Sequence, residues 1–167
     1  LYVRKDRIAE LEPTFLDLHA ARWITPDTYE IDPTAKRYEN WEFYIAGVIG
    51  LGVAVDYALG WGMEAIHQRV VGLAGNLRAS LGAIPGVTVT DIGMQKCGIT
   101  TFTKAGISPS GIKSALASKK INVSVSGRSS TLLDMDKRGL ADVVRASVHY
   151  YNDEAEIRRF CEAVEVL

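Results

Sequence analysis

The chain has 167 residues, of which 47% are hydrophobic and 23% are charged. This composition is typical of a globular protein and argues against a disordered, collagenous or disulfide-rich chain. The 19 Lys and Arg residues nearly balance the 20 Asp and Glu residues, so the net charge is −1. We therefore expect neither nucleic acid nor an anionic membrane as a partner. Two cysteines, Cys97 and Cys161, cannot build a disulfide framework, which favours reduced thiols and a cytoplasmic location.

The N-terminal part of the sequence contains little regular structure by pattern, and residues 14–36 show no convincing periodicity. Leu1, Tyr2 and Val3 are typical of a strand already under way, and residues 6–12 are compatible with a short helix. Residues 14–36 predict a long irregular segment, since two prolines interrupt them. A natural N-terminus seldom begins inside a strand, so we expect the chain to be a piece of a longer protein.

The pattern of helices and strands over residues 46–167 predicts one compact α+β domain. Residues 43–59 are apolar on nearly all faces, which is typical of a helix packed closely on several sides and too short to span a membrane. In residues 64–81 apolar residues recur at steps of three and four, which predicts an amphipathic helix.

The pattern then changes to short strands. Apolar and β-branched runs predict strands over residues 87–90, 97–102, 121–125 and 143–150. Ser108 and Pro109 begin a helix between the second and third strands, and Asn152 or Asp153 caps a last helix. The order predicts a small, mainly antiparallel sheet with helices on one face.

Few residues carry a signature of chemistry. The three histidines are widely separated and have no metal-ligand spacing, so no metal site is predicted. Two local motifs are more informative. Arg37-Tyr38-Glu39 leads into the apolar helix, and its structural interpretation is a helix start in which Arg37 pairs with Glu39.

The second motif, Val144-Arg145-Ala146-Ser147, places an arginine inside an apolar strand. A buried guanidinium requires an acidic partner, because an unpaired buried charge is very costly. Two interpretations stay open: an internal salt bridge, or a fork that binds a substrate carboxylate through two parallel hydrogen bonds.

At these motifs the chain resembles the C-terminal part of class V (fold-type I) pyridoxal-phosphate (PLP) enzymes, which include aminotransferases, cysteine desulfurases and isopenicillin-epimerase-like proteins. The opening Leu1-Tyr2-Val3-Arg4-Lys5, the Arg37-Tyr38-Glu39 motif, the helix before Gly62, and Val144-Arg145-Ala146-Ser147 with Tyr151-Asn152 follow in the family's order. The resemblance therefore covers the whole chain. It implies that residues 1–45 are a remnant of the large cofactor domain and that residues 46–167 form the small C-terminal domain.

The resemblance also implies roles for particular residues. Arg145 would bind the α-carboxylate of an amino-acid substrate. Arg37, Asn40, Trp41 and Glu42 would lie near the cofactor. Trp41 and Glu42 stand where the family has a Gly-Thr pair, whose Thr reaches the PLP phosphate of the neighbouring subunit, and a glutamate there would repel the phosphate.

Two departures limit the activity of this segment. The Schiff-base lysine of the family would precede Leu1, so none of the eight lysines occupies its place, and we expect this segment alone to be inactive and to hold no covalent cofactor. Some cysteine desulfurases carry a catalytic cysteine three residues after a glycine, and alignment on Gly127 puts Ser130 there. Persulfide-forming desulfuration is disfavoured, whereas transamination, racemisation or a lyase reaction stays open.

The leading hypothesis is thus a substrate-recognition and dimer-forming domain of a homodimeric PLP enzyme, with no catalytic residue in this chain. One alternative is a stand-alone α+β module that binds or senses a small molecule without catalysis. Another is a structural dimerisation domain in which Arg145 only pairs with an acidic residue. The bond cleaved and the substrate depend on groups outside these motifs.

Overall fold

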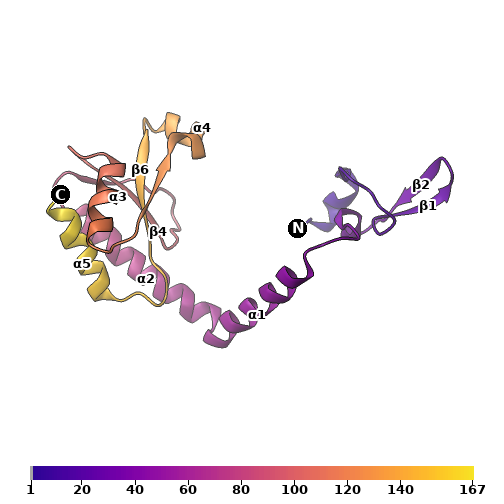
Figure 1. The fold of residues 1–167 in the computed structure, drawn as a ribbon, viewed down its shortest axis with the longest axis horizontal. Coiled ribbons are helices and arrows are strands. Elements are labelled where there is room, and N and C mark those ends of the chain that lie inside the picture. The colour runs from indigo at the N-terminus through magenta and orange to yellow at the C-terminus, as the bar shows by residue number, and fades with distance from the viewer. Residues whose placement is uncertain (1) are drawn as a thin grey trace. The chain divides into compact units, whose positions relative to one another are not determined.

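The computed structural model describes residues 2–167, and Leu1, the first residue of the predicted opening strand, lies outside them. The chain forms two compact units, one ending at Tyr57 and one running from Ala58 to Leu167. The two units are described separately (Figure 1). The assignment of residues 1–45 to another domain stays a prediction.

The first unit contains short elements and a hairpin. A 3-10 helix, η1 (Lys5–Glu10), precedes strands β1 (Ala21–Thr25) and β2 (Thr28–Ile31), and a second 3-10 helix, η2 (Ala35–Tyr38), follows them. Tyr2 and Val3 are not in a strand, and the irregular segment predicted over residues 14–36 in fact contains the antiparallel hairpin.

The hairpin is exposed on both faces, and polar contacts hold it together. The Thr25 and Thr28 hydroxyls bond to each other at 2.6 Å across the turn, and Arg22 pairs with Glu30 across the strands. Such exposed pairs contribute only modestly to stability.

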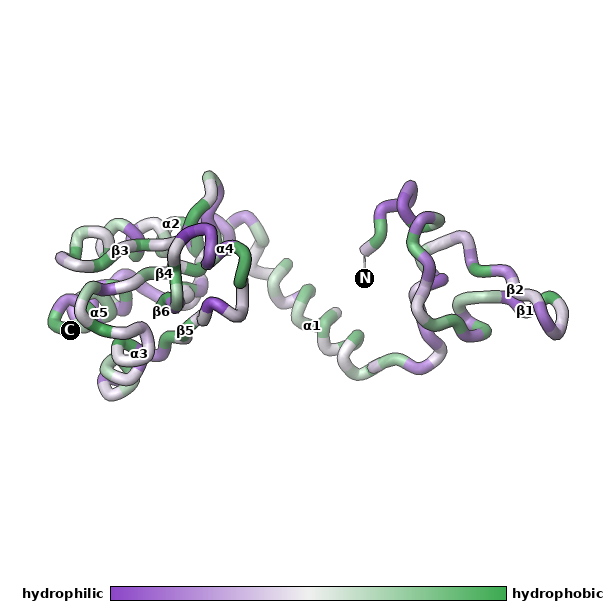
Figure 2. The backbone as a smooth tube through the Cα atoms, turned by 90° about the horizontal axis from the view of Figure 1, so that it is seen from above, coloured by the Kyte–Doolittle hydropathy of each residue, from purple (hydrophilic) through white to green (hydrophobic). Residues whose placement is uncertain are grey.

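Helix α1 (Ile45–Trp61) is the apolar helix predicted from the sequence, and none of its residues is buried. Its large apolar side chains are between 47% and 66% exposed. In Figure 2 most of its length is coloured green to white, which marks hydrophobic to intermediate residues. The expected close packing on several sides is therefore not formed within the first unit, which contains residues 45–57 of this helix.

The helix ends where Gly62 adopts a φ of 87°, a left-handed conformation that favours glycine. Helix α2 (Met63–Gly82) begins at the next residue. No single helix in residues 2–167 is long and apolar enough to cross a membrane, and the bent pair of α1 and α2 passes that test only jointly.

The second unit is built on a four-stranded antiparallel sheet in the order β3-β4-β6-β5. Its strands are β3 (Val87–Val89), β4 (Ile99–Lys104), β5 (Ser124–Gly127) and β6 (Asp142–Ser147). Helices α2, α3 (Pro109–Ser118) and α5 (Glu154–Glu165) cover one face (Figure 1). This confirms the predicted α+β fold.

The core lies between that face of the sheet and the three helices. Because side chains alternate along a strand, Phe102 of β4 and Val144 of β6 point into it, where they meet Leu77, Leu116 and Phe160. Ser108 and Asp153 cap α3 and α5 as predicted, and Asp153 forms a complete capping box with Glu156.

Several elements differ from the prediction. Strand β4 begins at Ile99 rather than at Cys97, and β6 ends at Ser147 rather than at Tyr150. The third strand begins at Ser124 rather than at Ile121, because the backbone of residues 120–121 still closes the end of α3. The connection from β5 to β6 contains η3 (Arg128–Ser130) and a short helix, α4 (Leu132–Lys137), neither of which was expected.

Candidate functional site

Arg145 lies on β6, inside the sheet, and its side chain is on the face away from the core. It stands directly opposite Thr101 of β4 and Ser124 of β5, whereas its neighbours Val144 and Ala146 belong to the core. Its side chain is exposed, so the expectation of a buried strand arginine is wrong. Sequence alone did not reveal which face of the sheet is open.

The surface around Arg145 is rich in hydroxyl groups. The strand register places on this face Thr88, Thr101, Thr103, Ser124, Ser126 and Ser147. Thr101 accepts a hydrogen bond from Thr90, and the other hydroxyls provide a polar surround for a ligand. We call this surface the Arg145 face.

Within residues 2–167, no oxygen atom accepts a hydrogen bond from the Arg145 guanidinium, and no carboxylate pairs with it. The internal salt bridge is therefore not formed among residues 2–167. A planar cation with its donors free on a polar surface suits a planar carboxylate, which accepts two parallel hydrogen bonds from it.

The loop that carries Ser130 follows the β5 end of the sheet. Ser130 is exposed and ends η3, three residues after Gly127, which is paired with Asp142 at the start of β6. Arg128 donates hydrogen bonds from Nε and Nη2 to the two carboxylate oxygens of Asp136, which holds the loop against α4. The hydroxyl of Ser130 thus sits on a loop of defined shape.

The cysteines lie elsewhere. Cys97 is exposed in the loop before β4, not inside a strand as predicted, and it lies near the end of β6 where Gly98 accepts from Val148. It is therefore at the opposite end of β6 from the Ser130 loop. Cys161 is buried on the core face of α5, as expected, and burial raises the pKa of its thiol.

Arg37 has a structural role in the first unit. Its Nη1 donates to the carbonyl oxygen of Ile8 at 2.8 Å, and the Tyr38 hydroxyl donates to the same oxygen. The expected pairing of Arg37 with Glu39 is not formed, since Glu39 instead lies 3.3 Å from His19 Nε2. Asn40 and Glu42 are exposed and lie outside this set of contacts.

Trp41 is held by a carboxylate that sequence analysis overlooked. Asp17 accepts the backbone N–H groups of His19 and Ala20 on Oδ1 and that of Trp41, at 2.6 Å, on Oδ2. The Trp41 ring meets His19 edge to face. An aspartate that bonds the backbone two residues on is a local signal, but its contact with Trp41 could not be foreseen.

These hydrogen bonds, above all the one from Trp41, lower the pKa of the Asp17 carboxyl. Its stabilising contribution is therefore present above the unfolded-state pKa of about 3.9 and is lost as pH falls through the lower folded-state value. We expect Asp17→Asn to speed hydrogen exchange of the Trp41 amide at pH 6, and this difference from the wild type to shrink below about pH 4.

Exchange measured by NMR from pH 3 to pH 6 checks this prediction. Asp27→Asn, in the exposed turn of the hairpin, is the matched control and should leave the Trp41 amide unchanged. A difference between Asp17→Asn and the wild type that does not vary with pH would show that the carboxylate charge is not what holds Trp41.

The histidines do not form a metal site, and no group of His, Cys, Asp or Glu suited to one occurs in residues 2–167.

Comparison with known proteins shows the family of the chain. The model of the family described as Aminotransferase class-V matches residues 1–160. The chain belongs to the aminotransferase class-V family.

Similar proteins carry a narrower description. This class-V chain is 28% identical over 168 residues to a probable cysteine desulfurase of Methanothermobacter thermautotrophicus, a match that covers 99% of the chain and 42% of that relative. It therefore spans about two fifths of that relative's length. The Arg145 face, Ser130 and the Asp17 contacts are thus features of one part of a class-V architecture.

Solved structures agree on the fold. The class-V chain matches a cysteine desulfurase from Thermococcus onnurineus with a TM-score of 0.86 at 24% identity, covering 99% of this chain and 41% of the other. The cysteine desulfurase CsdA from Escherichia coli gives the same TM-score at 20% identity, covering 99% and 41%. At these identities the likeness shows the fold alone.

Proposed function

We propose that this chain is the substrate-recognition and dimer-forming part of a PLP-dependent enzyme that acts on an amino acid. The observation that carries the proposal is Arg145, an exposed guanidinium with no acceptor in residues 2–167, on a polar face of the sheet. Arg145 binds and orients the substrate α-carboxylate, and the surrounding hydroxyls form further hydrogen bonds with that carboxylate.

We infer that the residues of this chain hold the carboxylate end of a substrate and that the covalent cofactor site lies elsewhere in the protein. Lys104 donates to the carbonyl oxygens of Val164 and Glu165, and every other lysine is exposed. When bound, PLP supplies the electron sink for cleavage at Cα. A C-DES variant that shares this fold holds glycine covalently linked to its PLP cofactor, and we infer that another part of the protein provides the lysine here.

The reaction we propose is one at the substrate Cα other than persulfide-forming desulfuration. Ser130 offers a hydroxyl at the place that the family resemblance gives to a loop cysteine, and a serine cannot form a persulfide. Cys97 lies at the opposite end of β6, and Cys161 is buried. Transamination, racemisation and a lyase reaction agree with these residues.

The exposed apolar surface of α1 supports the dimer-forming part of the proposal. Folded proteins seldom leave a large apolar surface in water, so α1 is expected to be covered in the assembled enzyme. The free cysteines and the balanced charge support a cytoplasmic location.

Replacing Arg145 in the full-length protein that contains this chain tests the proposal. We expect Arg145→Ala to raise the dissociation constant of the amino-acid substrate about 100-fold, because two charge-assisted hydrogen bonds are lost. Bound PLP, measured by its visible absorbance, should stay at the wild-type level. Arg145→Lys should recover part of the affinity, since a lysine keeps the charge but not the fork.

Arg158→Ala is the matched control, because Arg158 is exposed on α5 and away from the Arg145 face. Substrate affinity that is unchanged in Arg145→Ala would favour a structural dimerisation domain instead. A native enzyme that binds a small molecule but never holds PLP would favour the stand-alone binding module.

A further inference from the structure

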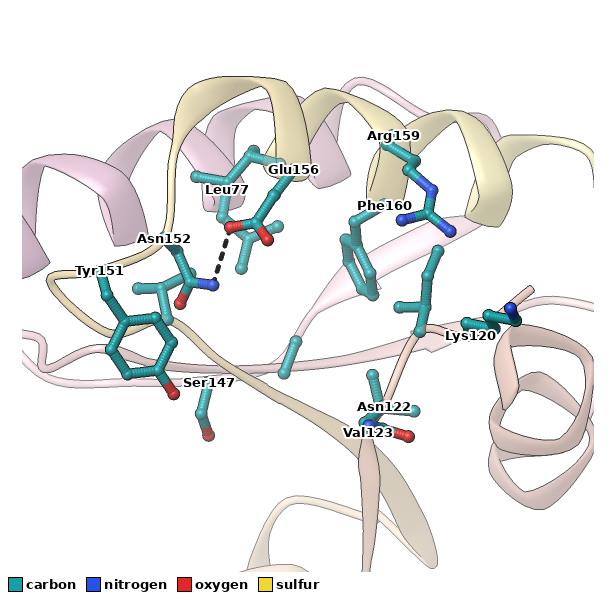
Figure 3. Close-up of a pocket in the computed structure, with 14 residues that line it drawn as sticks. Leu77, Lys120, Asn122, Val123, Ser147, Tyr151, Asn152, Glu156, Arg159 and Phe160 are labelled. Carbon is teal, nitrogen blue, oxygen red and sulfur yellow. Dashed lines mark hydrogen bonds between the residues drawn. The ribbon is translucent and has the colours of Figure 1, made fainter. Parts of the chain in front are cut away.

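A pocket of about 360 Å³ opens where β5 and β6 separate. The two strands are paired from Ser124 and Arg145 onward, but residues 120–123 turn away from the end of β6. Residues 146–148, the turn at residues 151–152 and α5 complete the walls (Figure 3). The pocket therefore lies within the second unit.

The base of the pocket is apolar. Leu77 of α2 and Ile157 and Phe160 of α5 are buried core residues that also line it. In Figure 3, Phe160 points from α5 into the pocket. Leu77 is drawn next to Glu156 at the other end of the pocket. An apolar ligand group placed there would extend the core of the unit and be removed from water.

The carboxylate on the rim is already engaged in hydrogen bonds. Glu156 accepts from the Asn152 amide at 2.9 Å and from the Asp153 backbone N–H at 3.1 Å, as part of the α5 capping box. This carboxylate is thus engaged in holding the helix start. The hydrogen-bond donors and the charge that a ligand meets at the rim therefore come from its other polar groups.

Two of those other groups, Lys120 and Arg159, are cationic and can only donate hydrogen bonds. Within residues 2–167, the side chains of Lys120, Asn122 and Tyr151 make no hydrogen bond, and Arg159 uses only Nη2, which donates to the Lys119 carbonyl oxygen. The ammonium of Lys120 and the remaining N–H groups of Arg159 are cationic. Their charge favours an anion at this end of the pocket.

Lys120 is also unusual in its backbone. Its φ is 59°, and it is the one residue other than glycine with a left-handed conformation in residues 2–167. It follows the end of α3 in a Schellman motif, in which Lys120 N–H bonds to Ala117 and Ile121 N–H to Leu116. Glycine is preferred at this position, so a lysine here costs stability and places an ammonium at the pocket.

We propose that this pocket binds a small organic carboxylate with an apolar body. The carboxylate lies between Lys120 and Arg159, and the apolar body contacts Leu77, Ile157 and Phe160. The proposal does not depend on the proposed enzyme function. Ser147 lines the pocket and also lies on the Arg145 face, but none of the five residues that hold the ligand belongs to that face.

Titration of the full chain with 3-phenylpropionate, followed by NMR of the backbone amides, tests the proposal. A probe of this size should bind with a dissociation constant of about 1 mM and shift the amides of residues 120–123 and 146–148. Lys120→Gly and Arg159→Gln should each weaken binding about tenfold. Because glycine suits this backbone, Lys120→Gly should keep or raise the melting temperature, so the loss cannot come from unfolding.

Arg158→Gln, on the outer side of the same helix, is the matched control and should bind the probe as the wild type does. The neutral amide 3-phenylpropanamide should bind at least tenfold more weakly than the acid. Equal binding of acid and amide, unchanged affinity in Lys120→Gly, or loss of binding in Arg145→Gln alone would each overturn the proposal, the last because it would place the probe on the Arg145 face.

Discussion

Replacing Phe102 with alanine is expected to lower the free energy of unfolding by about 4 kcal/mol. Phe102 is fully buried in β4, and its ring meets Phe160 of α5 edge to face with the centroids 6.1 Å apart. The substitution removes a large apolar group and leaves a cavity between the sheet and α5 that the rigid strand cannot fill. Urea denaturation of the full chain, followed by circular dichroism, measures the loss.

Phe15→Ala is the matched control, since Phe15 is 75% exposed in the first unit. It should change the stability by less than about 0.5 kcal/mol. A cost below about 1.5 kcal/mol for Phe102→Ala would mean that α5 is not packed on the sheet as described.

The second large effect is expected at Arg78, which anchors the loop between β3 and β4. Its Nε donates to Asp91 at 2.6 Å, and its Nη2 donates to the carbonyl oxygens of Cys97 and Ile99. The side chains of Arg78 and Asp91 are only 12% and 14% exposed. Arg78→Met should therefore cost about 3 kcal/mol, because it leaves a nearly buried carboxylate and carbonyl groups without donors.

A double-mutant cycle with Asp91→Asn checks the cause. The second substitution removes the unpaired charge, so the double variant should be more stable than Arg78→Met alone in the same denaturation assay. Strictly additive losses would show that Arg78 acts through its aliphatic stem rather than through the ion pair.

The parts of the fold that the sequence predicted are those with a strong repeat. The apolar stripe of α2, the Ser108 and Asp153 caps and the alternation in β3 each reflect local rules, and the structure confirms them. The β1–β2 hairpin escaped prediction because both of its faces are exposed, which leaves no apolar alternation. Helix α4 is only six residues long, too short for a period.

The candidate site was predicted in part. The motif placed Arg145 in a strand, but Val143 and Val144 are both apolar, so alternation could not tell which face the arginine occupies. The pairing of Arg145 with Thr101 and Ser124 settles this, and pairing between distant strands is not a local property. The same holds for Asp17 and Trp41, which are 24 residues apart.

The uncovered surface of α1 links the stability of this chain to its surroundings. Any surface that covers α1 in the folded state adds its binding free energy to the apparent stability through mass action. A melting temperature measured on a dilute sample is then a lower bound for the assembled protein. Comparisons between variants of this chain are meaningful only at one protein concentration.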